Sequence, residues 1–247
     1  MRYRFQAFKK ISMDDIKKRV DDSSNFYRES ILGFDYQLAK YHFASLKPFF
    51  KGNIALELGP ASGYMTKLLV NEFKTLHVLE VSESLLKEIP NYPNVTKFQS
   101  LFEDFTTTQK YDSIIMSHVL EHIENPTLVL QKIYNWLADD GIFLVSVPNA
   151  KSIHRLVAVE MGMLTNEYEL NSRDHELGHF RVYDMNTLSA QMTEAGFKIH
   201  EKGGVFFKPL SNGQIENNWT PEMIEGFYKI GKYFQENCSD LFMICSK

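Results

Sequence analysis

Two acidic residues and two glycines have the types and the spacing of a nucleoside-binding site. A short apolar run ends in Glu57, and Gly59 and Gly63 follow before a helical pattern begins. This order predicts a strand, a tight turn and a helix N-terminus, where glycines let the backbone approach a ligand and free N–H groups face it. A second apolar run, 76–79, ends in Glu80. An acid at the tip of the second parallel strand can accept hydrogen bonds from both hydroxyls of a ribose, so the spacing predicts a site for an adenosine-containing cofactor.

The residues that follow Gly59 separate two kinds of adenosine cofactor. A dinucleotide site favours Gly-x-Gly-x-x-Gly, because its pyrophosphate lies against bare backbone. Here Ala61 replaces the middle glycine, and Tyr64 stands where the last glycine would be. Glu57 would repel a pyrophosphate but attract the ammonium and the sulfonium of S-adenosylmethionine. The motif therefore favours S-adenosylmethionine, and an NAD-dependent oxidoreductase is the disfavoured alternative.

With these motifs the chain resembles the class I S-adenosylmethionine-dependent methyltransferases over about residues 35–200. Glu57, Gly59 and Gly63 match that family's first motif, and Glu80 matches its ribose-binding acid. Three later stretches are similar to further family motifs. Residues 98–105 resemble the loop that holds adenine, 111–122 resemble the fourth strand with its following turn, and 137–149 resemble the fifth strand with its preceding turn.

The resemblance implies a set of cofactor contacts, with S-adenosylhomocysteine as the product. The residues that it places at the cofactor are Glu57, Gly59, Pro60, Ala61, Gly63, Tyr64, Glu80, Val81, Leu101, Phe102, Glu103, Ser117 and His118. Two of them depart from the family's usual pattern, since many members have glycine at the position of Ala61 and an aspartate at that of Leu101. The contact to the adenine amino group is therefore left to a backbone carbonyl or to Glu103.

Polar residues after the predicted fifth strand are the candidates for acceptor binding, because the family places acceptor-binding elements there. The predicted substrate contacts are Asn149, Arg155, Arg181, Tyr183 and Lys208. Arginine pairs bidentately with carboxylate or phosphate. These cations therefore predict a small, polar, anionic acceptor, such as a metabolite or a nucleotide-linked sugar. A solvated surface position is the alternative for any one of them.

Three histidines are candidates for a general base, in the order His179, His154 and His122. Imidazole can take a proton from a hydroxyl or an ammonium at neutral pH, whereas a carboxylate or phosphate acceptor needs no base. The segment from His118 to His122 also matches the His-x-x-Glu-His of one class of zinc peptidase, but it follows a strand directly and lacks the helical setting of such a site. We expect no metal, although Glu121 and His122 leave open a divalent cation that lowers the pKa of an acceptor hydroxyl.

The elements that must position these residues alternate between strand and helix patterns. Strands are predicted at 54–58, 76–80, 95–99, 112–116, 142–147, 197–202 and 241–245, and helices at 14–30, 36–50, 63–72, 83–89, 126–138, 185–195 and 221–235. A glycine turn at 203–204 and a loop up to residue 218 are expected between the last elements. This alternation, with the resemblance, predicts an α/β fold: a Rossmann-like, doubly wound, seven-stranded, mostly parallel sheet with helices on both faces.

The predicted domain organisation has two parts. Residues 1–50 form an N-terminal helical cap, and 51–247 form the methyltransferase domain with a substrate-binding insert at about 150–183.

Composition excludes several classes of function. The 247 residues have a net charge of −4 without a block of like charges, which argues against a nucleic-acid partner. No apolar run approaches the length of a membrane span, and the N-terminus lacks the apolar segment of a signal peptide. Two cysteines, Cys238 and Cys245, are typical of buried thiols in a reducing compartment, so we expect a cytoplasmic protein.

The predicted function is methyl transfer from S-adenosylmethionine to the oxygen or the nitrogen of a small molecule, by a monomer or a homodimer. A non-catalytic S-adenosylmethionine-binding module is the second alternative, beside the oxidoreductase.

Overall fold

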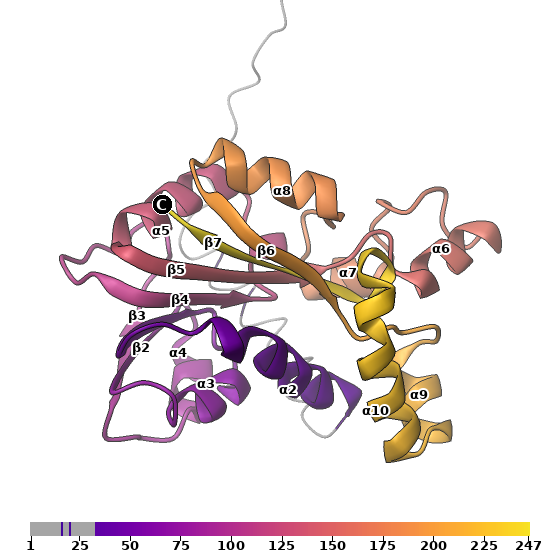
Figure 1. The fold of residues 1–247 in the computed structure, drawn as a ribbon, viewed down its shortest axis with the longest axis horizontal. Helices are drawn as coiled ribbons and strands as arrows, with labels where there is room; N and C mark the ends of the chain where they lie inside the picture. The colour runs from indigo at the N-terminus through magenta and orange to yellow at the C-terminus, as the bar shows by residue number, and fades with distance from the viewer. Residues whose placement is uncertain (1–15, 17–19, 21–32) are drawn as a thin grey trace, which may run out of the picture.

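The computed structural model describes residues 16, 20 and 33–247, and a seven-stranded sheet forms its centre (Figure 1). The strands are β1 (Ile54–Leu58), β2 (Thr75–Glu80), β3 (Val95–Gln99), β4 (Tyr111–Ser117), β5 (Leu137–Pro148), β6 (Lys198–Val205) and β7 (Asp240–Ser246). They lie in the order β3-β2-β1-β4-β5-β7-β6, in which the first five strands of the chain pair in parallel and β7 pairs antiparallel with β5 and β6. The predicted α/β fold with a mostly parallel sheet is confirmed.

The direction of winding reverses at β1, which brings the predicted cofactor residues to one edge of the sheet. The chain runs outward from β1 to β3 and then returns to place β4 on the other side of β1. In open α/β sheets, ligands bind beyond the carboxyl ends of the strands at such a reversal. Glu57 is the penultimate residue of β1, Glu80 ends β2 and Ser117 ends β4, so all three lie at this edge.

Helices cover both faces of the sheet. In Figure 1, α5 (Pro126–Trp136) and α8 (Met185–Glu194) lie on one face, and α2 (Phe34–Leu46), α3 (Tyr64–Leu69) and α4 (Glu83–Glu88) lie on the other. Buried leucines join each helical layer to the strands: Leu130 and Leu188 belong to the first core cluster, and Leu46, Leu69 and Leu86 to the second. The central strands β1 and β4 are apolar along most of their length because both of their faces are covered, whereas the edge strands β3 and β6 are more polar and more exposed.

Four further helices gather beyond one end of the sheet, on the right of Figure 1. They are α6 (Ile153–Glu160), α7 (Ser172–Leu177), α9 (Asn212–Asn218) and α10 (Pro221–Ile230). Short 3₁₀ turns complete the described part: η2 (Lys47–Phe49), η3 (Leu120–His122), η4 (Gly231–Tyr233) and η5 (Gln235–Asn237). The predicted insert at 150–183 thus contains two helices, α6 and α7.

Two expectations for the region after β6 are wrong. Gly203 and Gly204 lie inside β6 rather than in a turn. A Cβ on Gly204 would stand 2.2 Å from the carbonyl oxygen of Gln235, so the glycine permits close packing. The loop expected up to residue 218 contains α9, which begins where Ser211 and Gln214 cap one another. That pair is a capping box, a local signal that outweighs the polar composition of the segment.

The predicted N-terminal cap can be followed only in part. Helix α2 and the turn η2 account for the predicted helix at 36–50. The predicted helix at 14–30 lies outside the described residues, except for Ile16 and Val20. Over the described ranges, no helix has both the length and the apolar character needed to cross a membrane.

Candidate cofactor and acceptor site

A cavity of about 1430 Å³ opens at the carboxyl ends of β1, β2, β4 and β5. Its walls come from helix α2, from the loop at 101–104, from the turn after β4, and from the segments around α6 and α7. Small-molecule pockets commonly measure about 300–1,000 Å³, so this cavity has room for a nucleoside cofactor and a second molecule.

The turn after β1 is shaped by backbone conformations that favour glycine. Gly59 has φ +64°, and a Cβ on it would stand 2.5 Å from Cγ2 of Val119. Gly63 has φ +84° and precedes the first residue of α3. Ala61 lies between them at φ +46°, a left-handed conformation that L residues rarely adopt. The turn therefore holds its shape at Ala61 in spite of some backbone strain.

Glu57 presents a carboxyl group that is almost completely buried, with 3% of the residue exposed. The hydroxyl of Thr66 donates a hydrogen bond to its Oε2 atom over 2.6 Å. Burial raises the pKa of Glu57 to about 8, against the opposing effect of the Thr66 hydrogen bond, and the nearby charge of Glu80 adds to the increase. The group is therefore mainly protonated at pH 7, and a cation placed beside it would favour its ionised form.

Glu80 is also buried, but its carboxylate already accepts hydrogen bonds from the backbone. Its Oε1 atom accepts the N–H groups of Val81 at 2.8 Å and Ser82 at 3.1 Å. Its Oε2 atom accepts the N–H of Ala61 at 3.3 Å, which ties the end of β2 to the turn after β1. These bonds fix the carboxylate at the mouth of the reversal between the two strands.

All of the predicted cofactor residues except Gly63 line the cavity. The lining residues of this set are Glu57, Gly59, Pro60, Ala61, Tyr64, Glu80, Val81, Leu101, Phe102, Glu103, Ser117 and His118. Gly63 lies at the start of α3, where its positive φ shapes the turn.

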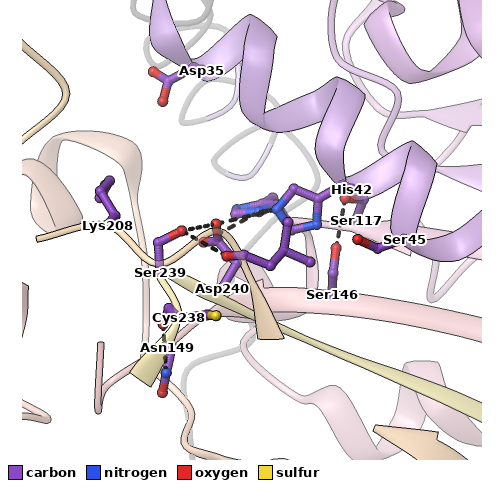
Figure 2. Close-up of polar contacts among 12 residues, drawn as sticks. Asp35, His42, Ser45, Ser117, Ser146, Asn149, Lys208, Cys238, Ser239 and Asp240 are labelled. Carbon is purple, nitrogen blue, oxygen red and sulfur yellow. Dashed lines mark hydrogen bonds and ion pairs between the residues drawn. The ribbon is translucent and has the colours of Figure 1, made fainter. Parts of the chain in front are cut away.

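His118 follows β4, is half-buried, and joins two buried polar residues. Its φ of +55° turns the chain at the end of the strand. Its Nε2 atom lies 3.0 Å from Nε2 of His42 and 3.7 Å from Oδ1 of Asp240, and His42 lies 3.3 Å from Oδ2 of Asp240. Figure 2 shows His42 reaching from α2 toward Asp240 at the start of β7. The two histidines, together with Lys208, hold the pKa of Asp240 well below its usual range, although burial alone would raise it.

A second cluster surrounds Glu121, which is completely buried in the turn η3. Its Oε1 atom lies 3.6 Å from Nδ1 of His118 and 4.0 Å from Nε2 of His122. Burial raises the pKa of Glu121 to about 8. The ring of His122 in turn meets that of His179, with 4.6 Å between the ring centres.

The orientation of His179 is fixed by a buried ion pair. Its Nδ1 atom lies 2.9 Å from Oδ1 of Asp174, and the other oxygen of Asp174 accepts a hydrogen bond from Arg155 over 3.1 Å. Burial alone would raise the pKa of Asp174, but hydrogen bonds from His179 and Asn171 and the charge of Arg155 lower it to about 2. Because Asp174 is then ionised at neutral pH, Nδ1 of His179 is the protonated nitrogen and Nε2 is left for a ligand.

The three histidines predicted as bases all line the cavity. They differ in their surroundings. Burial, with the charge of Lys208, lowers the pKa of His154 to about 3, which makes His154 a weak base at neutral pH. His179 has the carboxylate partner that a general base or a metal ligand requires.

The two arginines predicted to bind an anionic acceptor are engaged with the protein itself. Arg155 donates to the carbonyl oxygens of Glu167 and Glu169 in addition to Asp174. Arg181 donates to the carbonyl oxygens of Ile123 and Glu124 and does not line the cavity. The contacts of Arg155 hold parts of the insert together, and those of Arg181 hold it against the segment that follows the turn η3.

Of the remaining predicted substrate residues, two line the cavity and one does not. Tyr183 lies outside the cavity lining and donates to Gln191 over 3.3 Å. Asn149 lines the cavity, but its amide donates to the carbonyl oxygens of Glu236 and Cys238, both over 2.8 Å. Lys208 lines the cavity, and Figure 2 shows it on the side of Ser239 and Asp240 that faces Asp35.

Lys208 belongs to a polar wall that the sequence did not indicate. It donates to Asn212 over 2.8 Å, and Asn212 donates to Asp35 over 2.6 Å. Arg173 pairs with the same aspartate over 2.8 Å. Burial lowers the pKa of Lys208. All four residues line the cavity, so this wall carries two cations and one carboxylate.

Sequence reasoning missed three carboxylate or imidazole groups of the site: His42, Asp174 and Asp240. A usable signal exists only for Asp174, which lies five residues before His179 and forms a capping box with Asn171 at the start of α7. His42 and Asp240 come from opposite ends of the chain, so no local pattern joins them.

Comparisons with known proteins bear on the family and the fold of the chain. A model of the family described as "Methyltransferase domain" matches residues 33–202. The (S)-coclaurine N-methyltransferase of Thalictrum flavum subsp. glaucum is 30% identical over 102 residues, which cover 38% of this chain and 28% of that protein. The ubiquinone biosynthesis O-methyltransferase of Glaesserella parasuis is 27% identical over 145 residues, which cover 56% of this chain and 58% of that protein. The matches thus span less than two thirds of either relative.

Solved structures share the fold over most of the chain. One is a chain of the complex between the Haloferax volcanii Trm112 methyltransferase activator and a putative methyltransferase. Its TM-score is 0.65 at 13% identity, and the match covers 94% of this chain and 96% of that one. Another is an S-adenosylmethionine-dependent methyltransferase of Thermotoga maritima described as a possible histamine N-methyltransferase, with a TM-score of 0.64, 16% identity, and coverage of 94% and 99%. At such identities the likeness concerns the fold alone.

Proposed function

The chain belongs to the methyltransferase-domain family, and on that premise we propose that it transfers the methyl group of S-adenosylmethionine to a small polar acceptor. One observation carries the proposal: two buried carboxyl groups, Glu57 and Glu80, lie at the ends of neighbouring parallel strands and face one cavity. A buried carboxyl group that is protonated because no cation lies beside it suits a ligand with an ammonium group. A carboxylate held by backbone N–H groups suits the hydroxyls of a ribose.

The residues around the cavity support a definite orientation for the cofactor. Glu80 would accept the ribose hydroxyls, and Glu57 would face the ammonium of the methionine part. The loop at 101–103 would hold the adenine, and the bare backbone at Gly59 would lie under the sugar. Ser117 and His118, at the end of β4, would then be nearest the methyl group.

The cofactor brings its own reactivity as a sulfonium, so the task of the protein is alignment. Alignment of two bound reactants contributes on the order of 7–11 kcal/mol to a barrier that is otherwise bimolecular. Helix α2 forms one wall of the cavity, and α6 and α7 form part of another. These walls would hold the acceptor in line with the methyl carbon and exclude water.

The polar wall offers an anionic acceptor two cations beside the cavity. Arg155 and Arg181 are held by backbone carbonyls. An anionic group would therefore meet Lys208, which donates to Asn212, and Arg173, which pairs with Asp35. His179, held by Asp174, would take the proton of a hydroxyl or ammonium acceptor. Relatives named as O-methyltransferases and as N-methyltransferases both match the chain, which supports either chemistry.

The test is a screen of metabolite extracts with methyl-labelled S-adenosylmethionine. We expect one or a few small molecules to gain the label with the wild-type protein and none with the Glu57→Gln variant. Tight cofactor binding without label transfer to any extract would favour the non-catalytic module. Binding of NAD in place of S-adenosylhomocysteine, measured by calorimetry, would favour the oxidoreductase.

The charge of the acceptor is tested separately with the Lys208→Met variant. An anionic acceptor should show a KM at least tenfold higher with this variant, because removal of a charged partner costs on the order of 1.5–3 kcal/mol. The affinity for S-adenosylhomocysteine should stay unchanged. An unaltered KM would show that the acceptor carries no anionic group at this wall.

A further inference from the structure

The carboxylate of Glu121 has no account in the proposed methyl transfer. The residue is completely buried, and neither of its oxygens has a hydrogen-bond partner among the described residues. A buried polar group without a partner costs about 1–3 kcal/mol, and more when it is charged. Buried carboxylates persist in proteins when they are paired or when they bind metal.

Imidazole nitrogens surround this carboxylate. Nδ1 of His118 lies 3.6 Å and Nε2 of His122 lies 4.0 Å from its Oε1 atom. Donor atoms of Glu121, His122 and His179 all lie within 4.8 Å of one another. Adjacent ligands of a tetrahedral zinc-like ion, with bonds of about 2.1 Å, stand about 3.4 Å apart. An ion at the centre of three donors that are 4.8 Å apart would lie about 2.8 Å from each, so each donor would have to move toward it by less than about 1 Å.

The far nitrogens of two of these histidines are held by other residues. Nδ1 of His179 pairs with Asp174, which leaves Nε2 for the cavity. Nε2 of His118 is next to His42 and Asp240, which leaves Nδ1 facing Glu121. Metal-binding histidines commonly have a carboxylate or a carbonyl on their second nitrogen, because it fixes the ring and its tautomer. Asp174 serves His179 in this manner, and Arg155 in turn fixes Asp174.

We propose that Glu121, His122 and His179 bind a divalent cation in the wall of the cavity, with Nδ1 of His118 as a fourth ligand. Imidazole and carboxylate donors together favour ions such as Zn²⁺, Mn²⁺, Fe²⁺ or Co²⁺ over Ca²⁺ and Mg²⁺, which favour oxygen ligands.

The neighbouring group of His42, His118 and Asp240 is compact as well, but the atoms that face one another in it are already in contact, although Nδ1 of His42 has no hydrogen-bond partner among the described residues. The two histidine nitrogens are 3.0 Å apart and Asp240 lies 3.3 Å from His42. Asp240 also accepts a hydrogen bond from Ser239 over 2.6 Å (Figure 2). This group therefore acts as a support for the ring of His118, whereas Glu121 is the member of the site that lacks a partner.

The role of the ion rests on the proposed function. The site adjoins His118, next to the expected position of the transferred methyl group. An acceptor hydroxyl bound to the ion would have a lower pKa and would release its proton to solvent before attack. In the ion-loaded protein His179 would then be a ligand, and the ion would replace it in the activation of the acceptor.

The direct test is a titration of chelator-treated protein with Co²⁺, followed by the visible absorption of the bound ion and by the metal content after gel filtration. We expect one ion per chain and competition by Zn²⁺. Glu121→Gln and His122→Gln should each weaken binding at least tenfold. Asp174→Asn should weaken it about 10–100-fold, as does the loss of a group that orients a ligand. The control is His200→Gln, which removes an exposed histidine on β6 and should leave the affinity unchanged.

Three outcomes would overturn the inference. The wild-type protein could bind no ion, or Glu121→Gln and His122→Gln could both bind it with unchanged affinity while their circular dichroism shows that they are folded. Binding lost in His42→Gln but kept in Glu121→Gln would move the ion to the group around Asp240. Calorimetry with S-adenosylhomocysteine on the same samples separates this result from the proposed function, because cofactor binding depends on Glu57 and Glu80 and needs no ion.

Discussion

The Glu57→Gln variant should remove the pH dependence of cofactor binding, because the buried carboxyl group must lose a proton when the ligand's ammonium arrives. Burial raises the pKa of Glu57 to about 8 in the free protein. With that pKa the ionised fraction is about 1% at pH 6 and about one half at pH 8. If only the ionised form binds the ammonium, affinity rises with pH, by about 50-fold or about 2.3 kcal/mol between pH 6 and pH 8.

S-adenosylhomocysteine is the suitable probe, since it has the ammonium without the sulfonium. Calorimetry at pH 6, 7 and 8, in pairs of buffers with different ionisation enthalpies, gives the affinity and the number of protons released. At pH 7 the wild-type protein should release about 0.9 proton per ligand bound. Glu57→Gln should release none from this site, should bind about as weakly as the wild type at pH 6, and should show a nearly flat profile.

The matched control is Glu121→Gln, since burial raises the pKa of Glu121 to about 8 as well. Because the ammonium is assigned to Glu57 and not to Glu121, this variant should keep the 50-fold rise. A flat profile in the wild-type protein, or an equal slope in Glu57→Gln, would refute the assignment of Glu57 to the ammonium.

Four further results are expected. In chelator-treated protein, the free energy of unfolding should fall as pH rises, because the pKa of Glu121 is near 4.5 in the unfolded state and about 8 in the folded state. Urea titrations measure this fall. Between pH 6 and pH 8 it should be about 2 kcal/mol smaller in Glu121→Gln than in the wild type. Gly59→Ala should lower the free energy of unfolding by about 1–3 kcal/mol, because the new Cβ would meet Val119 and the residue would keep a positive φ. Adding Val119→Ala should restore only part of this loss, since it relieves the contact but not the backbone strain. Ala61→Gly should change that free energy by less than about 1 kcal/mol, whereas Ala61→Val should lower it further, because β-branched residues tolerate φ +46° least; equal effects would count against strain at this turn. Glu80→Gln should weaken S-adenosylhomocysteine binding at least tenfold in calorimetry. The rise of affinity with pH should persist but begin at lower pH, because the charge of Glu80 contributes to the raised pKa of Glu57. An unaltered affinity would remove Glu80 from the ribose.

Much of the fold could be predicted because its strands are buried on both faces. Parallel strands under two layers of helices are apolar runs, which the sequence shows directly at β1 and β4. Glu57 lies near the end of one such run and Glu80 ends another. An acid in this place indicates a binding site, because burial of a carboxylate costs free energy. Pro126 at the first turn of α5 and Gly196 after α8 gave clear helix boundaries.

The contacts within the insert could not be predicted, because they depend on which groups meet across the fold. An arginine in a polar segment has the same appearance in the sequence whether it binds a ligand or carbonyl oxygens of the chain. Arg155 meets Glu167, Glu169 and Asp174 only after α6 and α7 have folded against one another. His42, on α2, meets Asp240 at the start of β7, a contact between residues 198 positions apart.

Short capped helices were the other weakness of the sequence patterns. Helices α7 and α9 have only six and seven residues, too few for a clear apolar period. Their capping boxes were present in the sequence at Asn171 with Asp174 and at Ser211 with Gln214. Attention to these local pairs would have found both helices and would have drawn notice to Asp174.

A crystal structure of the chain with S-adenosylhomocysteine tests the central claim most directly. The account predicts the ammonium nitrogen within hydrogen-bond distance of the Glu57 carboxylate, both ribose hydroxyls on Glu80, and the sulfur near Ser117 and His118. A ligand bound outside the reversal between β1 and β4, or bound there with either carboxylate turned away from it, would contradict the account.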